Sequence, residues 1–213
     1  APPKVVFLEN VKNLVTHDNG NTFRIIKESL EELGYFVKFQ VMNACKYGNI
    51  PQNRERIYIV GFLDKDSYDR FAFPLPIQLK KQLSDVIDFA STVDEKYYYN
   101  PSCSFYNLLV KGMTKSDTVY QWRRKYVREN KSNMCPTLTA NMGTGGHNVP
   151  LVLTADSRIR KLTPYECFAI QGFPKDFKLP KDTSNTRLYK QAGNSVVVPV
   201  IQRIAEEIAK AIH

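Results

Sequence analysis

The residues best suited to chemistry are one glutamate and two arginines, each at the end of an apolar run. Glu9 follows the run KVVFL at residues 4–8, and Arg54 and Arg56 stand two apart where the run RIYIVGF begins. A carboxyl group can give a proton to a bound molecule, and guanidinium groups can stabilise negative charge that develops on it. Taken alone, the three residues are also compatible with solvated side chains at strand ends.

The runs that carry these residues indicate an α/β arrangement. The short β-branched run before Glu9 is typical of a buried parallel strand, and ligands of open α/β sheets bind at the carboxyl ends of such strands. A helix is predicted from Asn21 or Thr22 to Gly34, followed by strands at residues 35–41 and 56–62. Because alternate residues of a strand share a face, Arg54 and Arg56 can point into one pocket.

The texture of the sequence changes near Pro74, where we place a domain boundary. A helical piece is expected around residues 79–89, followed by short strands and glycine turns. Further on, Thr163 and Glu166 form a capping box that predicts a helix ending at Gly172.

A last helix at residues 199–212 carries one apolar stripe, which we expect to pack on the first domain. The predicted domains are therefore residues 1–73, 74–180 and 181–213, the last returning to the first.

Composition places the chain among ordinary globular proteins and suggests a polyanionic partner. Hydrophobic residues make up 43% and charged residues 24% of the 213 residues, and no apolar run approaches the roughly 20 residues of a membrane span. The 30 Lys and Arg against 21 Asp and Glu give a net charge of +9. Nucleic acid is a natural partner for such a chain, and a basic enzyme without one is the alternative.

The four cysteines are widely spaced, with no CxxC pair and no histidine at a metal-ligand spacing. We expect them to be reduced, the protein to be cytoplasmic, and no metal site to be present.

Four stretches in order resemble the later motifs of the cytosine-5 DNA methyltransferase family, of the bacterial restriction-modification type. They are FLENV from Phe7, PQNRERIYIVGF from Pro51, RKLTPYECFAIQGFP from Arg160 and QAGNSVVVP from Gln191. The resemblance implies the C-terminal part of a doubly wound α/β methyltransferase domain that uses S-adenosylmethionine, together with a smaller, mostly β target-recognition domain.

The resemblance also implies roles for the residues singled out above. In the family a cysteine thiolate attacks carbon 6 of a flipped-out cytosine, and charge builds on nitrogen 3 and oxygen 2 of the ring. Glu9 would then contact nitrogen 3 and favour its protonation, Arg56 would reach oxygen 2, and Arg54 would organise the nearby backbone, with Gln52 as a buttress.

The QAGNS stretch would complete the pocket for the methionine part of the methyl donor. Asn194 matches the family's final motif, Ser195 is a neighbour in that contact, and Gly193 would permit close approach. Capping of the next helix by Asn194 is an alternative that can hold at the same time.

Double-stranded DNA is the expected partner of two stretches. YQWRRKYVR at residues 120–128 offers Arg123, Arg124 and Arg128 to phosphates, although a plain basic surface strand is the alternative. CPTLTANMGTGGHNVP at residues 135–150 contains a threonine-leucine pair that recurs in the family's recognition domains. We expect base or phosphate contacts along it from Thr137, Leu138, Asn141, Gly143, Thr144, Gly145, Gly146, His147 and Asn148. Arg160, in a stretch that is mainly structural, is a further phosphate candidate.

The family's glycine-rich donor loop and its Pro-Cys nucleophile motif normally precede the glutamate strand. None of Cys45, Cys103, Cys135 and Cys167 lies in such a context. We therefore expect this chain to be a portion of a DNA cytosine-5 methyltransferase that is inactive alone and needs an N-terminal half or separate subunit with the nucleophile. The alternative class is a sequence-specific DNA-binding subunit without catalysis.

Overall fold

The computed structural model of the protein describes residues 1–144 and 148–213, which pack as two compact units. The first comprises Ala1–Gly48, Glu55–Gln78 and Pro199–His213, and the second comprises Asn49–Arg54 and Leu79–Val198. Residues 49–54 and 181–198 thus cluster with the second unit, whereas the predicted ranges assigned them elsewhere. No helix in the described part of the chain is long and apolar enough to span a membrane.

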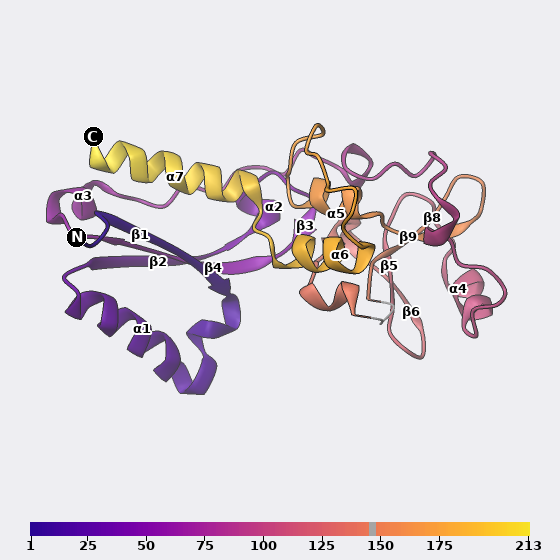
Figure 1. The fold of residues 1–213 in the computed structure, drawn as a ribbon, viewed down its shortest axis with the longest axis horizontal. Coiled ribbons are helices and arrows are strands. Elements are labelled where there is room, and N and C mark those ends of the chain that lie inside the picture. Colours follow the sequence, from indigo (N-terminus) through magenta and orange to yellow (C-terminus); the bar gives the residue numbers. More distant parts are fainter. Residues whose placement is uncertain (145–147) are drawn as a thin grey trace. The chain divides into compact units, whose positions relative to one another are not determined.

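The first unit is built on a three-stranded sheet in the order β1-β4-β2 (Figure 1). Its strands are β1 (Val5–Val11), β2 (Phe36–Asn43) and β4 (Glu55–Phe62). Both outer strands pair antiparallel with β4. The predicted buried parallel strand before Glu9 is therefore wrong: β1 is a partly exposed edge strand, and a short apolar run cannot reveal the direction of its partner.

Helices lie on both faces of this sheet (Figure 1). Helix α1 (Asn21–Glu32) packs Phe23 against Ile57 and Ile59 of the central strand, in a core that also holds Tyr35 and Val37. Helix α1 is preceded by Gly20 and followed by Gly34, and both glycines have positive φ angles, of 87° and 90°.

Helix α7 (Val198–Ile212) belongs to the first unit apart from its first residue, as the apolar stripe predicted. Its Val200, Ile204 and Ala211 are buried. The guanidinium of Arg203 donates to the carbonyl oxygens of Tyr47 and Leu75, at 2.8 and 2.9 Å. The short helices α2 (Ala44–Tyr47) and α3 (Lys65–Arg70) complete this unit.

The second unit contains a four-stranded antiparallel sheet, a two-stranded parallel pair and three short helices. The sheet has the order β6-β5-β8-β9, and β3 pairs with β7. The strands are β3 (Gln52–Asn53), β5 (Tyr120–Trp122), β6 (Val127–Glu129), β7 (Cys135–Pro136), β8 (Leu151–Leu153) and β9 (Ile159–Lys161). The helices are α4 (Tyr106–Gly112), α5 (Pro164–Ile170) and α6 (Asn185–Asn194).

The helix expected around residues 79–89 reduces to a single 3-10 turn, Leu83–Asp85. The carboxylate of Asp85 accepts from the backbone N–H of Gln82, and that of Asp88 accepts from those of Ala90 and Ser91. Such local side-chain bonds offer the backbone an alternative to a helix. The capping box of α5, in contrast, is confirmed.

Candidate active site and DNA-binding groove

Glu9 and Arg56 form an ion pair on one face of the first unit's sheet. In the β1–β4 register Glu9 lies opposite Tyr58 and Val11 lies opposite Arg56, so Glu9 and Arg56 are diagonal neighbours on the same face. The Nε of Arg56 is 3.0 Å from Oε1 of Glu9, and the two side chains are 13% and 25% exposed. The strands alone bring these two predicted residues together.

The pair leaves hydrogen-bonding capacity unused. Oε1 of Glu9 is buried, and among the described residues no donor is directed at it well enough for a hydrogen bond, although the ion-pair distance is short. The two charged groups therefore attract each other across 3.0 Å, but the N–H of Arg56 is not aligned with Oε1 of Glu9 as a hydrogen bond requires. Because buried acceptors normally have a donor, this oxygen is suited to receive one from a bound molecule.

Arg54 has different partners from Arg56. It is 4% exposed and belongs to the second unit, where its guanidinium donates to three carbonyl oxygens. These are the oxygens of Leu138, Gly193 and Ser195, at 2.7, 3.2 and 2.8 Å. We expected Arg54 and Arg56 to point into one pocket, and the structure differs. Arg54 precedes β4, and its guanidinium binds carbonyl oxygens of three backbone segments. The geometry makes Arg54 a positioning residue.

The QAGNS stretch forms the end of α6. Asn194 is the last residue of the helix, and α7 begins only at Val198, so Asn194 is too early in the chain to cap α7. Asn194 and Ser195 line a concavity of about 390 Å³, together with Arg187, Lys190 and Gln191. Four of these residues lie on α6 and Ser195 follows it, and the surface that they present to the concavity is mainly apolar.

Gly193 has a packing role in place of the expected approach to a ligand. A Cβ at this position would stand 2.2 Å from the carbonyl carbon and 2.3 Å from the carbonyl oxygen of Thr139. Backbone of the second unit already fills the space that the missing side chain leaves. The close approach that Gly193 permits in this structure is that of the Thr139 backbone.

A polar groove of about 940 Å³ in the second unit gathers several of the predicted DNA contacts, among them Arg123, Arg128, Thr137, Asn141 and Asn148. The hydroxyl of Thr137 donates to the carbonyl oxygen of Asn53 at 2.7 Å, which holds this threonine at the groove wall. Thr144 is exposed and its hydroxyl donates to the carbonyl oxygen of Asn141 at 3.0 Å. Arg124 is exposed at the turn between β5 and β6.

Two predicted DNA contacts on the recognition stretch are packing residues instead. Leu138 is fully buried in the core of the second unit. A Cβ on Gly143 would stand 2.0 Å from the carbonyl oxygen of Thr186, so this glycine lets the 3-10 turn Ala140–Gly143 pack on α6. The remaining predicted contacts, Gly145, Gly146 and His147, lie outside the described residues.

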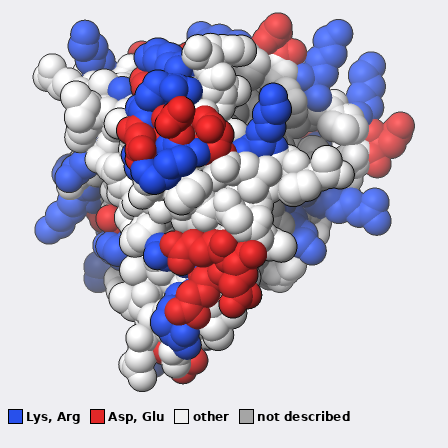
Figure 2. Space-filling view, turned by 90° about the vertical axis from the view of Figure 1, so that its left-hand side faces the viewer, with Lys and Arg blue, Asp and Glu red and all other residues white. Residues whose placement is uncertain are grey.

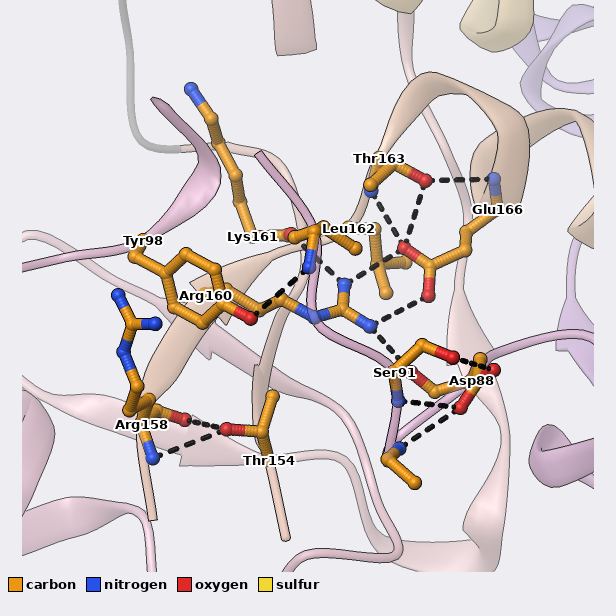
Figure 3. A network of polar contacts seen from close by, with 12 residues as sticks. Asp88, Ser91, Tyr98, Thr154, Arg158, Arg160, Lys161, Leu162, Thr163 and Glu166 are labelled. Atoms are coloured by element: carbon orange, nitrogen blue, oxygen red, sulfur yellow. Dashed lines mark hydrogen bonds and ion pairs between the residues drawn. The ribbon is translucent and has the colours of Figure 1, made fainter. Parts of the chain in front are cut away.

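Arg160 is also corrected, because its side chain is entirely buried and cannot reach phosphate in this structure. Its two terminal nitrogens each lie 2.8 Å from an oxygen of Glu166, and one also donates to the carbonyl oxygen of Asp88 at 2.6 Å (Figure 3). Glu166 in turn accepts from the backbone N–H of Thr163 in the capping box. Arg160 therefore fixes β9, α5 and the Asp88 turn together.

The sequence reasoning missed other residues that line the groove, among them Asn53, Gln121 and Lys131. Gln121 had a usable signal: once residues 120–129 are folded into a hairpin, it lies directly opposite Arg128. Asn53 had none, because only the distant pairing of β3 with β7 brings it there.

The chain's positive charge resides in the second unit. That unit carries 19 of the 30 Lys and Arg but only 10 of the 21 Asp and Glu, which accounts for the net +9, whereas the first unit has 11 of each. Exposed i,i+4 ion pairs on α1 and α3 illustrate the balance of the first unit. Figure 2 shows one face of the molecule on which basic side chains are interleaved with acidic ones.

Three of the four cysteines are buried and poorly placed for nucleophilic chemistry. Burial raises the pKa of the Cys45, Cys135 and Cys167 thiols above their ordinary value. A nucleophilic cysteine needs the opposite shift. Within the described residues, no group of three or more His, Cys, Asp or Glu could hold a metal ion.

Comparison with solved structures shows a shared fold. A methyltransferase of Entamoeba histolytica, EhMeth, matches with a TM-score of 0.70 at 20% identity, over 99% of this chain and 64% of its own. The Dnmt2 methyltransferase of S. pombe matches with a TM-score of 0.71 at 17% identity, over 99% of this chain and 66% of its own. The mixed α/β content of the chain is thus that of a methyltransferase fold.

Comparison with curated sequences shows closer relatives. The type II methyltransferase M.Bsp6I of Bacillus sp. (strain RFL6) is 63% identical over 98% of this chain and 66% of its own length. M.SsoII of Shigella sonnei is 40% identical over 97% of this chain and 53% of its own. The chain therefore spans between about half and two thirds of these relatives. The C-5 cytosine-specific DNA methylase family matches residues 1–210, and the chain belongs to that family.

Proposed function

We propose that this chain is the portion of a DNA cytosine-5 methyltransferase that stabilises charge on the target base and reads the DNA. The reaction is the transfer of a methyl group from S-adenosylmethionine to carbon 5 of a cytosine flipped out of a specific duplex sequence. The observation that carries the proposal is the partly buried Glu9–Arg56 pair, in which an acceptor oxygen and a guanidinium share one face of the sheet.

The chemistry of cytosine fits this pair. Attack at carbon 6 moves electron density onto nitrogen 3 of the ring and onto oxygen 2, the oxygen on the neighbouring carbon 2. Glu9 holds a proton at nitrogen 3, and Arg56 donates to oxygen 2 from an always-charged group. Preorganised donors of this kind are most effective where water is largely excluded.

We propose that the nucleophilic thiolate and the glycine-rich donor loop come from an N-terminal half or a separate subunit. The buried thiols, with their raised pKa values, support this division. So does the outer edge of β1, which has no strand partner among the described residues and carries the exposed side chains of Leu8 and Val11. An open edge beside an apolar strand is a natural place for another strand to add.

Asn194 and Ser195 are the residues of this chain that would hold part of the methyl donor. They line a concavity at the end of α6, and their side chains can form hydrogen bonds to the methionine part of S-adenosylmethionine. When bound, that molecule supplies an electrophilic methyl group. The remainder of its site would lie outside this chain.

Duplex DNA would bind the second unit, where the groove and the excess positive charge coincide. Arg123 and Arg124 are proposed to contact phosphates, with Thr137, Asn141 and Thr144 at or near the groove wall. The role fits a bacterial restriction-modification enzyme that works in the cytoplasm on the nucleoid.

The test is methyl transfer from labelled S-adenosylmethionine to DNA, by this chain alone and after mixing with the N-terminal third of a close relative such as M.Bsp6I. We expect activity only on mixing. Activity of the chain alone would overturn the missing-nucleophile proposal. Sequence-specific DNA binding without activity in either arm would favour the alternative, a non-catalytic DNA-binding subunit.

A further inference from the structure

The hairpin formed by β5 and β6 has one face that packs on the second unit and one open face. In its register Tyr120 lies opposite Glu129, Gln121 opposite Arg128, and Trp122 opposite Val127. Because opposed residues of an antiparallel pair share a face, Gln121 and Arg128 stand together on one side, and the other two pairs stand on the reverse side.

The reverse face anchors the hairpin rigidly. Tyr120 is fully buried, and the ring of Trp122 stacks on that of Phe105 with centroids 4.5 Å apart and an interplanar angle of 8°. Val127 packs so closely on α4 that a Cβ on Gly112 would stand 2.7 Å from it. Gln121 and Arg128 are thus presented from a fixed platform.

The side chains of the open face lie at the polar groove. Gln121 and Arg128 line it together with Trp122, Val127 and Glu129 from the reverse face, and Arg128 is exposed. No hydrogen bond or ion pair to another described residue engages either side chain, in contrast to Glu129 on the reverse face, which pairs with Lys115. Two unengaged polar side chains, fixed at neighbouring positions in a basic groove, are suited to an external partner.

We propose that Gln121 and Arg128 are specificity-determining residues that read two adjacent base pairs in the major groove of the DNA. The inference rests on the proposed function and deepens it. A two-stranded ribbon fits the major groove, where arginine binds O6 and N7 of guanine and glutamine binds N6 and N7 of adenine, each with two bonds. Cβ atoms of opposed residues lie about 5 Å apart, close enough to serve neighbouring base pairs. Arg128 therefore reads a guanine, and Gln121 reads an adenine beside it.

The tip of the hairpin has a separate task. Arg123, Arg124 and Lys125 are exposed there, and the turn is closed by a hydrogen bond from the N–H of Arg123 to the carbonyl oxygen of Tyr126, at 2.9 Å. Arg124 has a φ of 65°, which glycine would adopt more readily. An arginine in this unfavourable backbone conformation brings a positive charge to the turn that glycine would lack. A contact between Arg124 and a DNA phosphate would account for an arginine at this position.

The experiment selects bound sequences from a random duplex library with this chain and with four variants. Arg128→Ala should keep the preferred sequence except at one guanine, where discrimination falls on the order of tenfold to a hundredfold. Gln121→Ala should relax the adjoining adenine by a similar factor. Arg124→Ala should retain the full preference but weaken binding to every sequence, and lower the slope of log affinity against log salt by about 0.9.

Lys111→Ala is the matched control, since Lys111 is exposed on α4 in the same unit but does not line the groove. It should change neither preference nor salt slope. If Arg128→Ala weakens all sequences equally, the assignment of base reading is overturned while the proposed function stands. If the unaltered chain selects no sequence at all, DNA reading itself fails, and this inference fails with it.

Discussion

The carboxylate of Glu166 holds the buried guanidinium of Arg160 with two N–O contacts of 2.8 Å each. Arg160 is fully buried, and its Nε has no hydrogen-bond partner among the described residues. Such an arginine depends on its partner, because an uncompensated charge away from water is costly.

Glu166→Gln should therefore destabilise the protein by about 3 to 5 kcal/mol. The amide keeps the size of the side chain but not the charge that compensates Arg160. Denaturant unfolding of both proteins measures the difference. Glu95→Gln is the control, since the Glu95–Arg158 pair is exposed, and it should leave the midpoint unchanged. A Glu166→Gln protein as stable as the parent would show that Arg160 does not need its partner.

Gly193→Ala should cost about 3 kcal/mol or more, because a methyl group would overlap the backbone of Thr139, which cannot move as a side chain could. Gly20→Ala provides the comparison. Gly20 has a φ of 87°, but a Cβ there would meet its nearest atom at an ordinary 3.6 Å. That change should cost only about 1 to 2 kcal/mol for the left-handed backbone. Thermal unfolding ranks the two, and the reverse order would contradict the packing role of Gly193.

Glu9→Gln in the reconstituted enzyme should lower the methylation rate on the order of a hundredfold, while DNA affinity changes little. An amide cannot give up a proton to nitrogen 3 of the base. Glu55→Gln is matched to it, because Glu55 lies on the neighbouring strand in an exposed pair with Lys12 and has no proposed role. Single-turnover methylation and equilibrium DNA binding separate the two quantities. Equal rates for the Glu9→Gln and parent enzymes would remove Glu9 from the mechanism.

Stability should decline as the pH rises above about 9. Burial raises the pKa of the Cys135 and Cys167 thiols above 9.0 and that of the Tyr189 hydroxyl above 10.0, so the folded chain keeps these protons. The unfolded chain loses them as the pH passes those ordinary values, which favours unfolding. The stabilisation is complete below that range and is lost above it.

Urea unfolding midpoints measured between pH 7 and pH 10.5 test this expected loss of stability. Cys135→Ala removes one of the groups, so its midpoint should fall less steeply with pH even if it starts lower. An unchanged slope in that variant would show that the Cys135 thiol does not contribute.

The local elements that could be predicted were those with strong local signals. Helix α1, the capping box of α5 and the apolar stripe of α7 follow from residues three or four apart, and the structure contains all three. The helix expected near residues 79–89 failed because the carboxylates of Asp85 and Asp88 bind nearby backbone. No periodicity of apolar residues reports such competition.

The sequence by itself determined the family, the order of its motifs, and Glu9 and Arg56 as a candidate pair, because residue type and spacing carry those signals. Only the tertiary structure decided which arginines are available to a ligand. The guanidinium of Arg54 binds carbonyl oxygens and that of Arg160 binds Glu166, whereas Arg128 lines an open groove. The physical reason is that a guanidinium's partners come from segments far away in the chain. Whether a guanidinium forms its hydrogen bonds within the protein or stays available to DNA therefore depends on tertiary packing, which no local sequence pattern encodes.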